Sequence, residues 1–155
     1  MSFRILGLPA TPFLPLANLT DEDLASRHIE RRVAQEGSLF PDRIALREAT
    51  PGERVLLLHY ENQPATTPYR ASHAIFVIEG ERETFDAIDT VPDIMRKRLL
   101  SLRAFDADGM MVDADVVDGR EVEREIDRQL AQPQVAYIHA HYAKRGCYAA
   151  RIERA

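Results

Sequence analysis

The chain of 155 residues contains one cysteine and no tryptophan, and it has no long hydrophobic run. A single cysteine cannot form a disulfide within the chain, which is typical of proteins in a reducing compartment. No segment approaches the roughly 20 apolar residues that a membrane-spanning helix needs. Three prolines, Pro9, Pro12 and Pro15, interrupt the N-terminal hydrophobic residues, so this segment does not resemble a signal peptide. We therefore expect a cytoplasmic protein without a membrane partner.

An excess of positive charge is also absent. The chain has 25 acidic and 20 basic residues and a net charge of −5. Proteins that bind the phosphate backbone of nucleic acids normally present a basic face, so we expect no nucleic-acid partner. The acids concentrate in residues 80–130, which hold fourteen acids and eight bases. Solvated surfaces explain this asymmetry, and an alternative is a protein–protein interaction module in which residues 106–128 meet a basic partner.

The common catalytic and cofactor motifs are missing. The sequence has no phosphate-binding glycine loop, no G-x-S-x-G nucleophile elbow and no C-x-x-C pair. The sequence therefore identifies no cofactor, which we leave as unknown, and it does not decide whether the protein is an enzyme. Its length is that of one domain, so we expect residues 1–155 to fold as a single unit of unknown oligomeric state.

In the first half of the chain, local signals predict one helix and several strands. Thr20, followed by three acids, predicts the start of a helix that ends at Gly37. The apolar run 55–60 has the length of a strand and predicts a central strand covered on both faces. A loop over residues 62–72, which contains two prolines, separates it from a second buried strand at 73–79. Shorter elements are expected at residues 3–8 (a strand) and 38–52 (a loop with a strand near 44–47).

The second half is predicted to consist mainly of hairpins. Residues 99–105 and 110–117 form alternating runs joined by an Asp-Gly step, a strong signal for a β-hairpin. Residues 83–98 look helical in pieces, with Pro92 at the first helical position, N1, and residues 119–132 predict a helix. These elements predict an α+β fold, in which about three helices pack on a largely antiparallel sheet. The alternative is a partly closed barrel with the helices outside.

The terminal segment 135–153 concentrates reactive side chains: the only cysteine, two of five histidines and three of five tyrosines. It predicts a hairpin with a loop at 143–146. His139 and His141 then project from the same face of one strand, roughly 7 Å apart. Two imidazoles at this spacing can bind a metal ion, as in a metal-dependent enzyme with a water nucleophile, if a third ligand lies close. The candidates for that ligand are His59, His73, Glu61 and Asp113.

The register of this hairpin decides whether Cys147 can react together with the histidines. A four-residue loop places Gly146 where a positive φ is common and pairs His141 with Tyr148. Cys147 then lies on the opposite face from both imidazoles, whereas a slip of one residue would reverse this arrangement. We expect Cys147 to be buried and unreactive.

A second polar group precedes the strand at 73–79. Tyr69 and Arg70 can form a clamp for a carboxylate or phosphate, or Arg70 can pair with a surface acid while Tyr69 packs. Our leading hypothesis is a site for a small polar or anionic ligand where the 61–73 loop meets the C-terminal hairpin. The expected ligand-binding residues are Tyr69, Arg70, His73, His139, His141 and Tyr148.

Four stretches carry a family resemblance: FPDR, GERVLLLHYENQPATTPYRASHAIFV, LSLRAFDADG and YIHAHYAKRGCYAARIERA. Together they resemble the bacterial family known as domain of unknown function 1203, over nearly the whole chain. The resemblance implies a small cytosolic protein with no established activity and no catalytic residues to transfer. In that family a cysteine often occupies the place of Asp42, and an asparagine that of Tyr142. The first difference argues against a cysteine-based metal site or disulfide, and the second alters the polar character of the hairpin beside His141.

Overall fold

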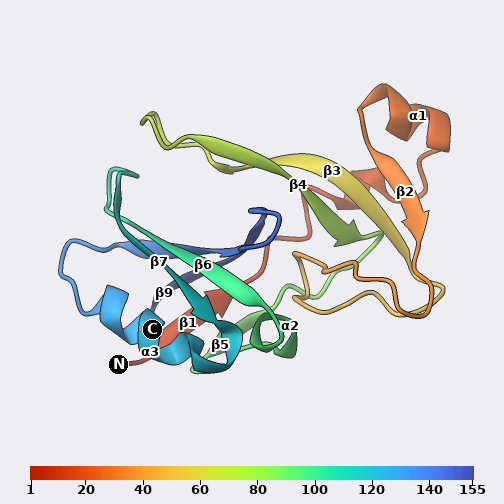
Figure 1. The fold of residues 1–155 in the computed structure, drawn as a ribbon. Coiled ribbons are helices and arrows are strands. Elements are labelled where there is room, and N and C mark those ends of the chain that lie inside the picture. The colour runs from red at the N-terminus through yellow and green to blue at the C-terminus, as the bar shows by residue number, and fades with distance from the viewer.

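Two antiparallel sheets and three α-helices make up the fold of residues 1–155 in the computed structural model (Figure 1), which confirms the α+β prediction. The large sheet has the strand order β5-β1-β9-β8-β6-β7, and the small sheet has the order β2-β3-β4. The strands are β1 (Phe3–Leu6), β2 (Glu30–Val33), β3 (Arg54–Gln63), β4 (Ala71–Ile78), β5 (Asp86–Ile88), β6 (Leu99–Phe105), β7 (Met111–Asp118), β8 (Tyr137–Tyr142) and β9 (Tyr148–Arg154). The helices are α1 (Asp21–Ser26), α2 (Asp93–Arg96) and α3 (Val122–Leu130).

The large sheet is covered differently on its two faces (Figure 1). Helix α3 lies against one face, where Val122, Ile126 and Leu130 join the main hydrophobic core. Hairpin β3–β4 extends over part of the other face. The large sheet is open, with β5 and β7 at its edges, so the barrel alternative is wrong. None of the helices has the length and hydrophobicity needed to span a bilayer.

The small sheet and the large sheet are joined by a second apolar cluster. Leu56, Leu58 and Ile75 of hairpin β3–β4 belong to it, and so does Tyr148 of β9. Tyr148 is almost fully buried, and its ring lies 6.4 Å from that of Tyr60. Burial of these side chains holds hairpin β3–β4 against the large sheet at strand β9.

The terminal hairpin forms in the predicted register. His141 pairs with Tyr148, and Gly146 has a φ of +76° at the end of the four-residue loop. The register shifts between Ala140 and His141, which absorbs one extra residue in β9. His139 and His141 therefore share a face, and their ring centroids are 6.5 Å apart.

The helix predicted from Thr20 to Gly37 is wrong beyond its first six residues. Thr20 does cap it, because its hydroxyl accepts a hydrogen bond from the Asp23 N–H. The helix ends at Ser26, since His28 adopts a φ of +58° and Ile29 N–H donates to the Leu24 carbonyl. These bonds form a Schellman-type C-cap, which normally uses glycine. Residues 30–33 then form strand β2.

Three other boundaries differ from the prediction. The loop expected at 62–72 is shorter, because β3 continues to Gln63 and β4 begins at Ala71. Residues 38–52 contain two isolated bridges and no strand near 44–47. The region predicted as helical pieces, 83–98, contains strand β5 and then α2, for which Pro92 is the N-cap. Strand β3 is central in the small sheet, as predicted, but its His59 is exposed.

Candidate functional site

Two rows of polar side chains cross the face of the large sheet that looks toward hairpin β3–β4. Directly paired residues of antiparallel strands project from the same face. His141 of β8 pairs with Tyr148 of β9 and with Ser101 of β6. His139 pairs in the same way with Arg151 and Arg103, which adds a second row. The first row is therefore Tyr148–His141–Ser101, and the second is Arg151–His139–Arg103.

The small sheet adds a third histidine to these rows. The His73 ring, on β4, lies 5.2 Å from the His141 ring in an edge-to-face arrangement. The His139 and His141 rings also lie 5.1 Å and 5.8 Å from the Tyr148 ring. We refer to His73, His139 and His141 as the histidine cluster. The structure thus brings together four of the six residues expected at the ligand site.

The other two expected residues, Tyr69 and Arg70, lie on the surface. Arg70 pairs with Glu61 at 2.8 Å, and both of these side chains are exposed. Tyr69 is also exposed, and its backbone N–H donates to the Thr67 hydroxyl. Neither residue makes a hydrogen bond, ion pair or ring contact with the histidine cluster. For Arg70, the structure shows the surface ion pair that was the alternative to a ligand clamp.

Burial keeps His139 and His141 neutral near pH 7. Their side chains are almost inaccessible, and desolvation lowers the pKa of each to about 3. The positive charge of Arg103 lowers both values further, and Arg151 acts in the same direction on His139. The pKa of His73 is also lowered, first by desolvation and then by Arg103.

In two of the three neutral imidazoles, a hydrogen bond fixes which ring nitrogen carries the proton. His141 Nδ1 lies 2.9 Å from the Gly146 carbonyl, which can only accept, so this nitrogen carries the proton. His73 Nδ1 lies 3.0 Å from Asn62 Oδ1 and donates in the same way. The Nε2 atoms of both rings therefore have free lone pairs. His139 Nδ1 is buried without any partner, which is unusual for a polar atom in a folded protein.

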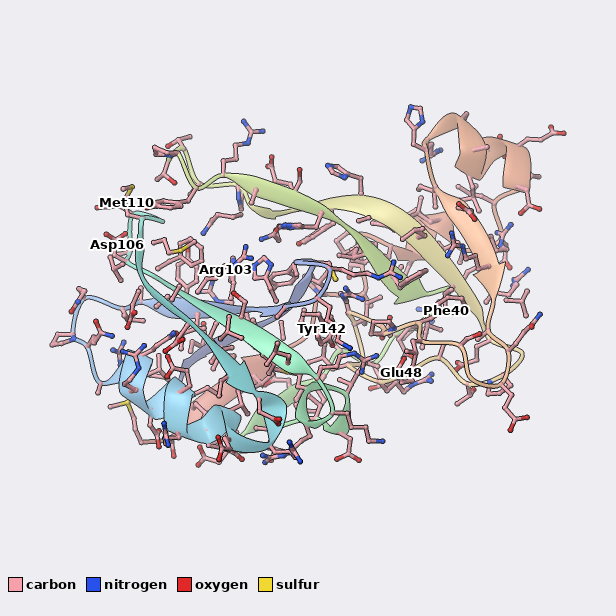
Figure 2. All side chains as sticks on the ribbon, in the orientation of Figure 1. Phe40, Glu48, Arg103, Asp106, Met110 and Tyr142 are labelled. Atoms are coloured by element: carbon pink, nitrogen blue, oxygen red, sulfur yellow. The ribbon has the colours of Figure 1, made fainter.

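Arg103 lies beside the cluster and has no carboxylate partner. Arg43, whose charge also lowers the pKa of His73, has no carboxylate partner either, but its guanidinium donates to the Tyr148 and Pro41 carbonyls. The only side-chain hydrogen bond of Arg103 runs from Nε to the Ser101 hydroxyl at 3.3 Å. The side chain is half-buried, and desolvation lowers the pKa of the guanidinium. Figure 2 shows it on the side of the large sheet that faces hairpin β3–β4. The neighbouring Arg151 differs, because Glu153 neutralises it at 3.0 Å.

This combination of groups suits an anion better than a metal ion. No group of three histidine, cysteine or acidic side chains is arranged to hold a metal, so His139 and His141 lack a third protein ligand. The Arg103 charge also repels cations from the cluster. A guanidinium with free N–H donors binds carboxylates and phosphates through charge-assisted hydrogen bonds.

Cys147 lies apart from this site, as the register predicted. It packs against the core on the α3 side of the large sheet, and it is half-buried where full burial was expected. Its sulfur lies 3.0 Å from Nη2 of Arg43, a buried side chain that also donates to the Tyr148 and Pro41 carbonyls. Arg43 thus links the 41–47 loop to the terminal hairpin.

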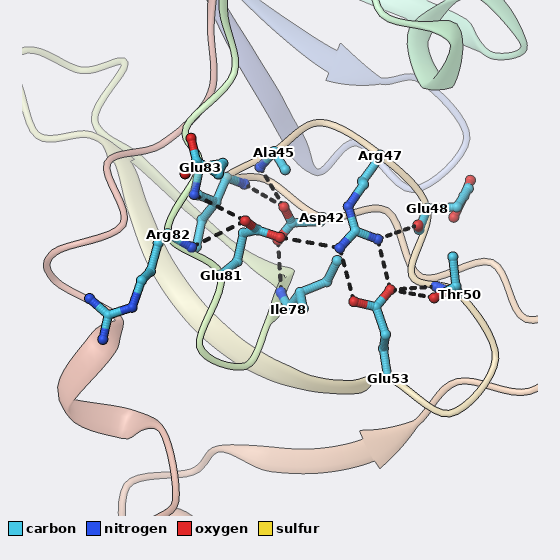
Figure 3. Close-up of polar contacts among 11 residues, drawn as sticks. Asp42, Ala45, Arg47, Glu48, Thr50, Glu53, Ile78, Glu81, Arg82 and Glu83 are labelled. Atoms are coloured by element: carbon cyan, nitrogen blue, oxygen red, sulfur yellow. Dashed lines mark hydrogen bonds and ion pairs between the residues drawn. The ribbon is translucent and has the colours of Figure 1, made fainter.

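Asp42 and Tyr142 are the two positions where the chain differs from the family pattern, and both side chains are buried. Asp42 is fully buried, and its carboxylate accepts hydrogen bonds from the backbone N–H groups of Ile44, Ala45 and Ile78 (Figure 3). Burial nevertheless raises its pKa. These bonds tie the loop that carries Arg43 to the end of β4. Tyr142 points to the opposite face of β8 from His141, where the guanidinium carbons of Arg43 and Arg98 lie 5.0 Å and 5.1 Å from its ring centroid.

Two surface cavities lie away from the histidine cluster. The first, of about 420 Å³, is basic, but ion pairs already neutralise its three arginines. Its lining residues are Arg96, Lys97, Arg98, Leu99, Asp118 and Arg120. The second, of about 480 Å³, lies around Arg4, which Asp86 neutralises. We favour the histidine cluster over both cavities because only there do an unpaired guanidinium and an unpartnered buried nitrogen occur together.

The sequence reasoning missed Ser101, Arg103 and Asn62. A usable signal existed for the first two, because Ser101 and Arg103 alternate with apolar residues along the strand 99–105 and therefore share one face. The sequence did not show which strand lies next to residues 99–105 in the sheet. Only the pairing of β6 with β8 places Arg103 opposite His139.

The fold and this site define an α+β protein of two antiparallel sheets, with a candidate anion site made of histidines and an unpaired arginine between them. The chain belongs to the family described as "Protein of unknown function (DUF1203)", whose model matches residues 39–154. This match confirms the resemblance seen in the sequence. No curated protein and no solved structure matches the chain significantly.

Proposed function

We propose that this protein binds a small anionic ligand at Arg103 and the histidine cluster. The observation that carries the proposal is the half-buried Arg103 guanidinium, which has no carboxylate partner and lies next to His139. Leaving a partly desolvated charge unpaired costs free energy, and a bound anion would recover that cost. Tyr69 and Arg70, which are exposed, have no role in this proposal.

The histidines supply the second part of the recognition. As neutral rings, His73 and His141 offer Nε2 lone pairs that accept hydrogen bonds from a hydroxyl or a protonated acid group of the ligand. An anion bound at Arg103 would also offset the positive charge that now lowers the pKa of each histidine. Binding would therefore favour proton uptake by the cluster, and ligand affinity would increase as the pH falls.

A titration followed by nuclear magnetic resonance tests the proposal. Propionate and inorganic phosphate serve as probes at pH 6.5, and the imidazole signals of all five histidines are recorded. We expect saturable shifts of the signals of His73, His139 and His141. The exposed His28 and His59 are internal controls and should not shift. Equal shifts at all five rings, or none at 100 mM probe, would show that the cluster is not an anion site.

A further inference from the structure

The middle of strand β7 directs apolar side chains toward solvent and an acid toward helix α3, although Val117 at its end packs against the core. Asp113 pairs with Arg128 of α3 at 2.8 Å, and Asp115 shares its side of the strand. Val112, Ala114 and Val116 project from the other face and are exposed, Val116 to 55 % of its surface. An edge strand beside a helix normally turns its valines inward, so this inverted pattern calls for an explanation.

The register places these valines beside the candidate site. Ala114 pairs with Arg103, and Val116 pairs with Ser101, so both share a face with the polar rows. Leu99, 46 % exposed, lies at the start of β6 on that same face and also lines the rim that the strip shares with the basic cavity. We refer to Leu99, Val112, Ala114 and Val116 as the apolar strip. Together with Arg103, it continues the site outward to the open edge of the large sheet.

The backbone of β7 shows which kind of occupant does not fit. The N–H groups of Ala114 and Val116 donate to the Asp113 and Asp115 carboxylates, each at 2.8 Å. An edge strand whose N–H groups bond to its own side chains is a poor template for another strand. This argues against a peptide or a second copy that pairs with the β7 edge.

The position of Arg103 limits the occupant further. The guanidinium is half-buried beside the histidine cluster, whereas Val116 and Leu99 are exposed. A narrow anionic end group can reach the guanidinium while the apolar remainder lies along the strip. Building on the function proposed above, we propose that the ligand is a carboxylate with an apolar tail, and that Val116 and Ala114 contact this tail.

Calorimetric titration with propionate, hexanoate and octanoate, all below micelle formation, tests this inference. Octanoate has five more methylenes than propionate, and each methylene that is fully buried lowers Kd by about fourfold. On an open strip we expect about half of the full free-energy gain, so octanoate should bind roughly 30-fold more tightly than propionate. The Val116→Thr variant should lose much of this chain-length gain while binding propionate normally. Ile88→Thr is the matched control, because Ile88 is equally exposed (58 %) but lies on β5 at the opposite edge of the sheet.

The possible outcomes distinguish a failure of the apolar-tail proposal from a failure of the anion-site proposal. If all three carboxylates bind equally and all lose affinity in Arg103→Gln, the proposal of an apolar-tail contact is wrong, whereas the proposal of an anion site is supported. If none of them binds, both proposals fail. Octanol binding as tightly as octanoate would overturn the inference, because the strip would then act without Arg103. So would a dimer, seen by light scattering, that Val116→Thr dissociates, since the strip would then be a self-association surface.

Discussion

Replacing Arg103 by glutamine is expected to weaken propionate and phosphate binding by about ten- to hundredfold at pH 6.5. A hydrogen bond to a charged group is worth about 1.5–3 kcal/mol, and here the guanidinium has no carboxylate partner and keeps free N–H donors beside the histidine cluster. Glutamine keeps a polar side chain that can still bond to Ser101. The change should therefore leave the fold intact, which circular dichroism and the thermal midpoint would verify.

Arg70→Gln provides the matched control for this variant. Arg70 lies on hairpin β3–β4 and pairs with Glu61 at the surface, so its loss removes the same net charge from the protein. We expect its dissociation constants to stay within twofold of those of the unmodified protein. If the two variants weaken binding equally, the effect comes from overall charge, and Arg103 has no special role.

The free energy of unfolding is expected to fall by about 2 kcal/mol per buried histidine between pH 7.5 and pH 5.0. An unfolded histidine titrates near 6.5, whereas His139 and His141 have pKa values of about 3 in the folded protein. Below pH 6.5 the unfolded chain therefore binds protons that the folded protein does not, so stability rises with pH across this window. The loss ends only when the pH falls below the folded-state values.

Chemical denaturation at the two pH values measures this effect. In His139→Phe the pH-dependent loss should shrink by about 2 kcal/mol, because the ring that resists protonation has been removed. His28→Asn is the control, since His28 is exposed and asparagine tolerates its positive φ. If His139→Phe keeps the full pH dependence, His139 is not held neutral by its surroundings.

Local signals predicted those parts of the fold that depend on neighbouring residues. The Asp-Gly step gave the β6–β7 hairpin, and Asp106 accepts bonds from the backbone of the turn as its residue type suggests. Gly146 correctly predicted the register of the terminal hairpin, and this register places His139 and His141 on the same face. These features need no knowledge of distant contacts.

The failures share one cause, which is that distant contacts decided the outcome. The segment after Thr20 was predicted to stay helical to Gly37, but residues 30–33 pair with β3, and Arg31 bonds to Glu79, 48 residues further along the chain. The candidate site depends on the same kind of contact. The sequence showed where polar residues gather, but the order β9-β8-β6 and the docking of β4 decided that His73 and Arg103 belong to the site while Arg70 pairs at the surface.

A crystal structure with 4-bromobenzoate tests the central proposal most directly, because the anomalous signal of bromine locates the ligand and its orientation. We predict a carboxylate within hydrogen-bonding distance of Arg103 and a bromine over Ala114 and Val116. The competing position is the basic cavity around Lys97. A ligand ordered only in that cavity, with none beside Arg103, would contradict the assignment of the anion site to the histidine cluster.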